Sequence, residues 1–335
     1  KFMKRILIID NSDLSYSGND IDGTFLRGTE TSLILLSEQF AKMGYSVDYT
    51  NEINNLIKIN GVNYFNKNKI NKSTIYDLVI AISDANQFKL ASAKKKVVFS
   101  VSNQPIEKFL RKKQLLPFLK YKPTVVTLCN YQFKKRSYFT SFYGKEIIPI
   151  TSDPKFLNYE IDANYIPSKQ VVYNIRSNRN LDKLIKIWIE KIYPVNNEFK
   201  LFITPDLIEY NDNLKNKNIF LRKIGTRHEM IDELKHYRAL TYLGHKSDIF
   251  TLTAEEAVKL CVPVVTFGIG SLSDRVKHFE NGFIANNDEE FAKYTIKLMN
   301  DDKFYLQMKS KMIGIRHENN WENIAKLWIK KFINN

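Results

Sequence analysis

The sequence has 335 residues, of which 44% are hydrophobic and 26% are charged. These proportions exclude a disordered or fibrous chain, and the length predicts two domains. No apolar run approaches the ~20 residues that span a bilayer, and the N-terminal stretch lacks a secretory pattern, so we expect a cytoplasmic protein. Cys129 and Cys261 lie in apolar stretches without metal-ligand spacing, which predicts buried free thiols.

The net charge of +15 is concentrated in one segment. Residues 89–145 hold fourteen Lys or Arg residues against a single acid, Glu107, and apolar residues are interleaved with the basic ones. Such a face can attract an anionic membrane surface, and it is also what a simple solvated, lysine-rich face looks like. The sequence leaves these two interpretations open. Nucleic acid, which basic patches also attract, is not expected as a partner.

Short apolar strands alternate with helical segments along the whole chain. The expected strands are 4–10, 46–50, 77–82, 96–101, 124–129, 146–150, 170–174, 199–204, 219–224, 239–243, 263–267 and 282–285. The expected helices include 30–43, 105–116, 180–192, 228–237 and 253–261. Nearly continuous apolar strands separated by helices indicate parallel sheets that are covered on both faces. The predicted fold class is therefore α/β, with two Rossmann-like, doubly wound parallel-sheet domains.

The domain boundary is expected where the strand–helix alternation is interrupted. Pro154, Pro167 and mixed polar residues interrupt it around 151–168. We therefore expect domains at 1–160 and 161–318. Residues 319–335 contain an amphipathic helix, whose apolar stripe predicts packing on a core and which we expect to cross back over the boundary.

Ligands of open parallel sheets bind beyond the carboxyl ends of the strands, and one loop there is unusual. Residues 247–257 read SDIFTLTAEEA, with Asp248 and Glu256 eight residues apart. A helix is expected to start near Ala254 with Thr253 as its N-cap, which places Asp248 in the loop and Glu256 in the first turn. Glu256 can then be a ligand residue, or it can complete a capping box with Thr253.

The next expected strand is followed by glycines. Residues 262–276 read VPVVTFGIGSLSDRV, in which Gly268 and Gly270 precede a short helix expected near Asp274. Glycine allows backbone to approach a phosphate, and a helix N-terminus supplies N–H donors. The sequence completes neither a Walker motif nor a G-x-G-x-x-G fingerprint, which disfavours an NAD-dependent enzyme.

The combination D-x-F-x-x-x-x-x-E-A, V-P-V-V-T, G-x-G-S-L-S-D-R-V and N-G-F resembles the donor half of retaining GT-B glycosyltransferases, especially family 4 (glycosyl transferases group 1). The resemblance covers about 40 residues closely. The family usually has Glu at Asp248, Gly at Thr251 and Gly before the proline, where this chain has Val262. The GT-B fold would place two domains around a central cleft.

This resemblance implies roles for individual residues. Asp248 would face the hydroxyls of the donor sugar and Glu256 would bind the nucleotide ribose. Arg179 would fall where the family has a phosphate-binding Lys, and Asn174 where it has an Arg. The implied catalytic residues are Asp248, Glu256 and Arg179. The implied donor-binding residues are Gly28, Thr29, Arg176, Arg179, Asp248, Phe250, Thr251, Leu252, Glu256 and Gly270.

The first domain would then serve the acceptor. Ser102 and Asn103 fall where family members often carry a His, and all five histidines lie at 228 or later. No metal or other cofactor is expected beyond the nucleoside-diphosphate sugar, and Asp20-x-Asp22 is interpreted as a chance D-x-D in a loop. A retaining mechanism in which the departing phosphate assists the acceptor would tolerate the missing His.

The resemblance therefore predicts a hexosyltransferase. It would move sugar from a nucleoside-diphosphate donor to a glycan or lipid-linked acceptor, in cell-surface polysaccharide biosynthesis, in the cytoplasm and at the inner face of the membrane. The alternatives are a sugar-nucleotide epimerase on the same fold and a non-catalytic basic protein that binds membranes or RNA.

Overall fold

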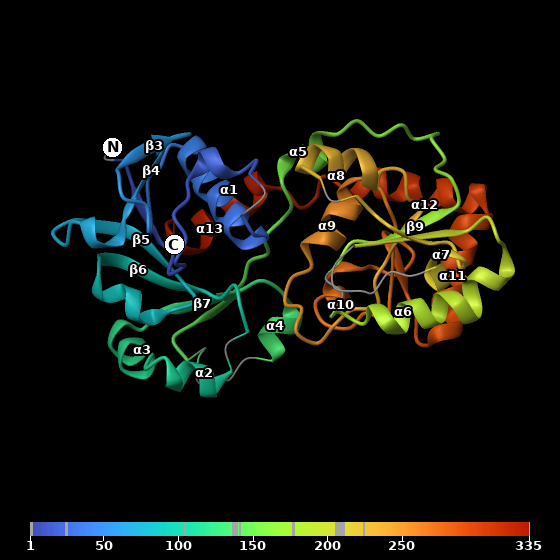
Figure 1. The fold of residues 1–335 in the computed structure, drawn as a ribbon. Coiled ribbons are helices and arrows are strands. Elements are labelled where there is room, and N and C mark those ends of the chain that lie inside the picture. Colours follow the sequence, from blue (N-terminus) through green and yellow to red (C-terminus); the bar gives the residue numbers. More distant parts are fainter. Residues whose placement is uncertain are drawn as a thin grey trace. The chain divides into compact units, whose positions relative to one another are not determined.

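The computed structural model describes residues 3–23, 26–103, 105–135, 140, 142–175, 178–204, 212–223 and 225–334. The chain divides into two compact units, one formed by residues 1–151 with 319–335 and the other by residues 152–318. Each unit is an α/β structure built on its own sheet (Figure 1). The predicted fold class is confirmed.

The first unit contains, among its described residues, an eight-stranded sheet of order β3-β4-β2-β1-β5-β6-β7-β8. Its strands are β1 (Arg5–Ile9), β2 (Ser46–Asn51), β3 (Ile57–Ile59), β4 (Val62–Asn66), β5 (Ile75–Ile82), β6 (Ser92–Phe99), β7 (Thr124–Thr127) and β8 (Lys145–Ile147). All pairs are parallel except β3 with β4. The order reverses between β1 and β5, which makes this the topological switch point of the first sheet.

Helices cover both faces of this sheet (Figure 1). They are α1 (Gly28–Lys42), α2 (Ile106–Arg111), α3 (Leu115–Tyr121), α4 (Asn130–Lys134) and α13 (Trp321–Phe332), with short helices η1 (Gly18–Asp20), η2 (Lys67–Lys69) and η3 (Ala85–Lys89). Consecutive residues of β6 point to opposite faces. Val98 belongs to the cluster that contains Phe109 of α2 and Phe118 of α3, whereas the Phe99 ring lies 5.1 Å from that of Trp328 on α13.

The second unit contains, in the part of the chain that is described, a six-stranded parallel sheet of order β11-β10-β9-β12-β13-β14. Its strands are β9 (Gln170–Tyr173), β10 (Lys200–Ile203), β11 (Ile219–Leu221), β12 (Ala239–Thr241), β13 (Val264–Thr266) and β14 (Gly282–Ile284). The order reverses between β9 and β12, so the switch point of this sheet lies between the loops that follow these two strands.

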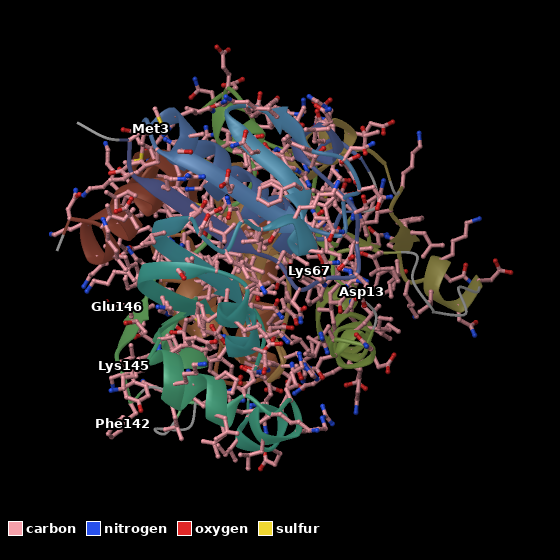
Figure 2. The ribbon with its side chains drawn as sticks, turned by 90° about the vertical axis from the view of Figure 1, so that its left-hand side faces the viewer. Met3, Asp13, Lys67, Phe142, Lys145 and Glu146 are labelled. Atoms are coloured by element: carbon pink, nitrogen blue, oxygen red, sulfur yellow. The ribbon has the colours of Figure 1, made fainter. Side chains whose placement is uncertain are left out.

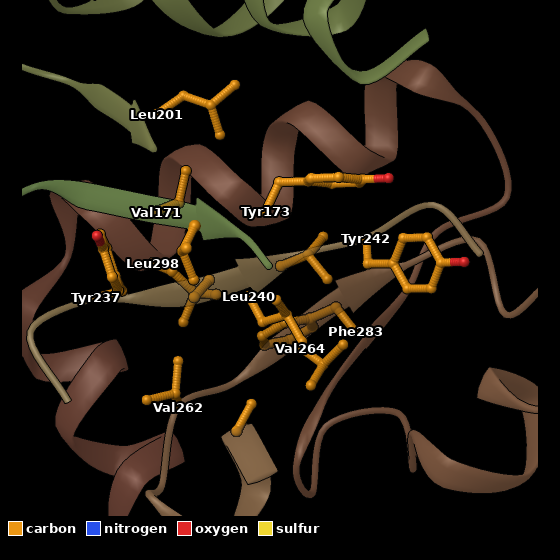
Figure 3. Close-up of a cluster of buried hydrophobic side chains, with 14 of the residues drawn as sticks. Val171, Tyr173, Leu201, Tyr237, Leu240, Tyr242, Val262, Val264, Phe283 and Leu298 are labelled. Carbon is orange, nitrogen blue, oxygen red and sulfur yellow. The ribbon is translucent and has the colours of Figure 1, made fainter. Parts of the chain in front are cut away.

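The helices of the second unit enclose a continuous apolar core. They are α5 (Pro154–Asn158), α6 (Leu181–Ile187), α7 (Asp212–Lys215), α8 (Arg227–Leu234), α9 (Leu252–Lys259), α10 (Leu272–Arg275), α11 (Asp288–Asn300) and α12 (Asp302–Ile315), with a π-helix at Trp188–Ile192 and a 3-10 turn, η6, at Tyr193–Val195. Side chains of neighbouring strands, such as Val171, Leu240, Val264 and Phe283, meet in this core (Figure 3).

Several local expectations were wrong. The predicted helix 105–116 is two helices, because the chain turns at Lys113, which has a positive φ of 52°. The antiparallel hairpin β3–β4 was not predicted. The predicted helix 180–192 is confirmed as a helical segment, although it continues as a π-helix after Ile187. Both cysteines are buried thiols, as expected.

The contacts divide the chain after Thr151, earlier than the expected residue 160. Pro154, which was taken as a sign of a linker, is at the start of α5, and Asp153 accepts a hydrogen bond from the Lys155 N–H at 2.8 Å as the N-cap. Phe156 of α5 is fully buried in the second core. Helix α13 belongs to the first unit, where it lies beside α1.

Candidate functional site

A pocket of about 360 Å³ lies at the switch point of the second sheet. It is lined by residues that follow the carboxyl ends of β9, β10 and β12: Asn174, Ile175, Arg179, Thr204, Asp248, Phe250, Thr251, Leu252 and Thr253. Five of the predicted site residues, Arg179, Asp248, Phe250, Thr251 and Leu252, are therefore in one pocket. This is where an open parallel sheet binds its ligands.

An arginine and a carboxylate face one another in this pocket. Arg179 Nε lies 3.3 Å from Asp248 Oδ1, and both side chains are largely buried. Arg179 Nη1 donates to His245 Nδ1 at 3.3 Å, which also accepts the Ser247 N–H at 3.2 Å. The pair therefore holds a cation at the mouth of the pocket while leaving most of the guanidinium's N–H donors for a ligand.

Two tyrosines support Asp248 from the end of the sheet. The hydroxyl of Tyr242 donates to Asp248 Oδ2, and Figure 3 shows the hydroxyls of Tyr242 and Tyr173 directed toward the same edge. The two rings lie 5.9 Å apart in an edge-to-face arrangement. Burial first, and then the neighbouring Asp248 carboxylate, raises the pKa of Tyr242, so its hydroxyl stays a proton donor.

The loop between β12 and α9 is fixed by a stacked cation. The Arg275 guanidinium lies 3.4 Å from the centre of the Phe250 ring and pairs with Glu255 at 3.1 Å. The hydroxyls of Thr251 and Ser271 are 3.0 Å apart and buried. Phe250 and Thr251 are thus held in place by α9 and α10, and the loop is preorganised without a ligand.

The glycines after β13 have a packing explanation. A Cβ on Gly270 would come within 2.3 Å of the His245 carbonyl oxygen, and its φ is +75°. Gly244, with φ +95°, likewise lies against the backbone of Ile269. Glycine is therefore required so that the loop carrying Asp248 can lie against the 268–270 turn. A contact of Gly270 with a donor stays a prediction.

Glu256 is not a capping residue. Helix α9 starts at Leu252 rather than near Ala254, its N-cap is Thr251, and no side chain caps its first turn. The Thr253 capping box was wrong because the helix begins two residues earlier and carries Glu256 into its second turn. Burial raises the pKa of Glu256 to about 7, opposed chiefly by the field of Arg227. A half-buried carboxylate without a capping role is a stronger ligand candidate than the sequence indicated.

Two arginines near Glu256 were not predicted. Arg222 follows the end of β11, pairs with Glu233 at 2.5 Å and donates to the Asn174 side chain. Arg227 opens α8 and pairs with Asp153 at 2.5 Å. Both lower the pKa of Glu256 and so favour its ionised form. Position 222 could have been found by applying the strand-end rule to every strand, because it directly follows one.

Asn174, where the resemblance implies an arginine, lines the pocket. Its amide oxygen accepts a hydrogen bond from Arg222, so a guanidinium lies next to this position. Arg176, the other predicted phosphate ligand, lies outside the described residues.

The predicted residues of the first unit are more scattered. Gly28 and Thr29 are in the first turn of α1, whose N-cap, Arg27, makes no side-chain capping bond. Ser102 and Asn103 follow β6, where Lys108 Nζ approaches the Ser102 hydroxyl at 3.4 Å and the Asn103 carbonyl at 3.3 Å. Because β6 lies next to β5, these two residues are one strand away from β1 and β5, which flank the switch point.

The switch point of the first sheet carries a polar cluster that the sequence did not single out. Asp10 follows β1 and accepts hydrogen bonds from the hydroxyls of Ser12 at 2.6 Å and Tyr16 at 2.5 Å. Asn11 donates to Asp84, which follows β5, at 3.4 Å. By their place beyond the strand ends, these residues are better-placed candidates for ligand contacts in this unit than Ser102 and Asn103.

Within the described residues, no group of three or more His, Cys, Asp or Glu side chains is arranged to hold a metal ion. Asp20 of the D-x-D accepts the Ser17 N–H at 2.8 Å in the capping box of η1, which gives it a structural role. Over the same part of the chain, no helix is both long and apolar enough to cross a bilayer.

Known proteins resemble this chain in fold, and the match to a family model lies in the unit that contains the pocket. Residues 205–313 match the model of the family "Glycosyl transferases group 1". An uncharacterized glycosyltransferase of Haemophilus influenzae is 28% identical over 171 residues, which are 47% of this chain and 46% of that protein. The match thus spans about half the length of this curated relative.

Solved structures extend the likeness to the whole chain. The sucrose-phosphate synthase of Thermosynechococcus elongatus has a TM-score of 0.68 and 13% identity, covering 99% of this chain and 100% of that one. Anabaena HepE in complex with UDP gives the same TM-score, identity and coverage. The chain is therefore a protein of the GT-B glycosyltransferase fold. The residues that match the group 1 glycosyltransferase model lie within its second unit.

Proposed function

We propose that this chain is a retaining glycosyltransferase that moves a hexosyl unit from a nucleoside-diphosphate sugar to a glycan or lipid-linked acceptor. The observation that carries the proposal is the pocket at the β9–β12 switch point, in which Arg179 and Asp248 face one another. A cation beside a carboxylate matches a ligand that carries a diphosphate next to a hydroxyl-rich sugar.

Each part of the donor has a matching group. The diphosphate would be bound by Arg179, a bidentate donor suited to phosphate, with no metal ion needed in the proposal. The sugar hydroxyls would donate to Asp248. The ribose hydroxyls would donate to Glu256, whose charge Arg222 and Arg227 favour.

The reaction would be a displacement on one face of the sugar. The bond from the anomeric carbon to the phosphate oxygen breaks, the bond to the acceptor oxygen forms, and the acceptor's proton passes to the departing phosphate. Arg179 would stabilise the charge that develops on that phosphate. The first unit has no histidine, since all five lie between residues 228 and 317, and this mechanism requires none.

The donor base and the location are further parts of the proposal. HepE binds UDP and, in another crystal, UDP-glucose, so UDP is the first nucleotide to test. Two free cysteines are usual in a reducing compartment, which supports the cytoplasm. The basic segment 89–145 supports a position at the inner membrane surface, where cell-surface polysaccharides and lipid-linked acceptors would be met.

Thermal unfolding with UDP, GDP, ADP, dTDP, CMP and NAD, each at millimolar concentration, tests the donor site. A ligand at ~100 times its Kd adds about 2.7 kcal/mol to the free energy of unfolding. We expect one nucleoside diphosphate to stabilise the wild type and to lose most of this effect with Glu256→Ala. Stabilisation by NAD alone, or by no nucleotide, would overturn the proposal. Incubation with the matching sugar nucleotide, followed by NMR of the anomeric proton of the product, tests transfer and retention.

A further inference from the structure

A second and larger pocket, of about 500 Å³, lies in the first unit. It is formed at the amino ends of two strands, where Ile75 begins β5 and Ser92 begins β6. The switch-point loops follow the carboxyl ends of the strands, at the opposite edge of the same sheet. This pocket is therefore separate from any acceptor or donor site at the carboxyl edge.

The pocket is strongly basic. Among its lining residues are five lysines and no acid: Lys72, Lys89, Lys94, Lys96 and Lys120. Lys94 pairs with Asp77 at 2.7 Å, just outside the lining, and Lys96 Nζ donates to the Ala93 carbonyl at 2.9 Å. Within the described part of the chain, Lys72, Lys89 and Lys120 have no acidic partner. Their mutual repulsion would be relieved by a bound anion.

The floor and rim of the pocket are apolar. Phe88 and Tyr121 lie with their rings 5.9 Å apart, and Lys120 lies over the Tyr121 ring at 5.3 Å. Ile75 on the rim is 64% exposed. The pocket therefore offers aliphatic and aromatic contacts beside its positive charge, which a purely inorganic anion would leave unused.

Helix α3 continues this surface with exposed leucines. Leu116 is 76% exposed and Leu119 is 42% exposed, and both lie within one turn of Lys120 on the same helix. Phe142 is 78% exposed, and Figure 2 shows it projecting outward from the first unit near Lys145. Large exposed apolar side chains among lysines are the composition of a surface that enters the headgroup layer of an anionic membrane.

We propose that the first unit docks on anionic membranes through this pocket. The lysines would bind the phosphate of a phospholipid headgroup, and Leu116 and Leu119 would enter the acyl boundary beside it. The inference rests on the proposed membrane-surface location and does not depend on glycosyl transfer.

Vesicle flotation of the whole protein tests the inference. Vesicles of phosphatidylcholine with 30% phosphatidylglycerol are compared with pure phosphatidylcholine at ~0.1 M salt. We expect binding to the anionic vesicles only. Lys89→Gln with Lys120→Gln should weaken this binding roughly 25-fold, if each lysine contributes about a fivefold factor near the surface. Leu116→Ser with Leu119→Ser should weaken it at unchanged net charge.

The control removes the same charge elsewhere. Lys293→Gln with Lys303→Gln, both exposed on the second unit, should leave flotation unchanged. Equal losses in the two lysine pairs would mean that net charge, and not this pocket, is responsible, and would overturn the inference. So would a wild type that does not float. A thermal unfolding profile like that of the wild type shows that each variant is folded, and stabilisation by the nucleotide identified above shows that the donor site is independent of this pocket.

Competition separates the anion sources. If millimolar glycerol 3-phosphate protects the wild type against thermal unfolding, but not the Lys89/Lys120 variant, and no protein floats, then the pocket binds a small phosphate compound and the membrane inference is wrong. Short RNA and inorganic phosphate are also added to the vesicle-bound protein at the same concentration of charge. If RNA releases the protein and phosphate does not, the surface binds nucleic acid and the membrane inference is wrong.

Discussion

Arg179 Nε lies 3.3 Å from Asp248 Oδ1, joining the loop after β9 to the loop after β12 across the switch point of the second sheet. The two residues are 69 positions apart in the sequence, and each follows a different strand. A buried ion pair of this kind contributes little net stability, because desolvation offsets the attraction. The pair instead holds a cation and a carboxylate at fixed positions. A charged ligand that enters the pocket can then take the place of one member of the pair and bind the other.

Arg179→Ala is expected to weaken nucleoside-diphosphate binding by about 10- to 100-fold, the worth of a hydrogen bond to a charged group. Arg179→Lys should recover part of the affinity, since Lys keeps the charge without the planar fork. Titration calorimetry with the stabilising nucleotide measures both. Lys186→Ala, which removes an exposed cation from α6, is the matched control and should bind normally. Equal affinities for Arg179→Ala and the control would remove Arg179 from the donor site.

Glu256 makes the stability of the free protein depend on pH. Its pKa is about 7 in the folded chain and 4.5 in the unfolded reference. As pH rises from below 4.5 to above 7, the unfolded state loses this proton before the folded state does. The free energy of unfolding of the wild type therefore falls by up to about 3 kcal/mol relative to that of a variant without the carboxylate. Glu256→Gln should therefore gain stability over the wild type between pH 5 and pH 8 in urea unfolding.

In the difference between the wild type and Glu256→Gln, the contributions of all other titrating groups to the free energy of unfolding cancel. Glu160→Gln, at an exposed position of the same unit, is the control for the removal of a carboxylate. If the difference in the free energy of unfolding between Glu256→Gln and the wild type is constant with pH, then Glu256 ionises freely and is not buried as described.

Ligand binding should show the opposite trend with pH. Ribose hydroxyls donate to a carboxylate more strongly than to a carboxylic acid, so nucleotide affinity of the wild type should rise as pH increases through about 7. Glu256→Gln should bind more weakly, with an affinity that changes less over pH 6 to 8. Calorimetry at several pH values measures the difference. A wild-type affinity that is flat across this range would place the ribose elsewhere.

The fold could be predicted because buried parallel strands appear in the sequence as nearly continuous apolar runs. Core strands such as β5 and β13 were located by that signal. The hairpin β3–β4 was missed because its strands are short and half polar, although Asn60-Gly61 between them is the usual two-residue turn. Both residues have positive φ, of 49° and 83°. The residues of the turn therefore indicated this hairpin, although the hydrophobic pattern of its strands did not.

The candidate site was predictable where one loop contains it. Asp248, Phe250, Thr251 and Leu252 are neighbours in sequence and share the pocket. The surroundings of Glu256 come from three other places in the chain, the ends of β11, α8 and α5, and nothing local in the sequence indicates that they meet. Helix starts were also uncertain, since Thr253 fits a capping box by sequence and Thr251 takes the position in the structure.

A glycine of the family pattern that this chain lacks shows the same limit. The sequence comparison placed the lost glycine at Val262, but the residue with the left-handed backbone is Cys261, with φ 57°, directly after the C-cap of α9. The chain carries a buried cysteine in a conformation that favours glycine, so the turn is kept although the residue differs.

Gly270→Ala should damage the donor pocket from outside it. A methyl group there meets the His245 carbonyl oxygen at 2.3 Å, and the left-handed backbone alone costs about 1–2 kcal/mol for an L-residue. We expect lower thermal stability together with weaker nucleotide binding, because the displaced backbone carries Asp248. Gly314→Ala in α12, where a Cβ has no neighbour within 4 Å, should instead be neutral or stabilise by up to about 1 kcal/mol. If both substitutions behave alike, close backbone approach is not the reason for Gly270.

Trp328 of α13 should contribute more to the first unit than any other residue of the C-terminal helix. It is fully buried, and its ring lies 5.1 Å from Phe99 of β6 and 5.3 Å from Phe332. Trp328→Ala leaves a large cavity and should cost about 3–5 kcal/mol in the free energy of unfolding. Because Trp328 Nε1 has no hydrogen-bond partner among the described residues, Trp328→Phe loses no bond and should cost clearly less. Differential scanning calorimetry with and without the stabilising nucleotide separates the units: the loss should fall on the transition that the nucleotide does not raise. A loss confined to the nucleotide-dependent transition would show that α13 stabilises the second unit instead.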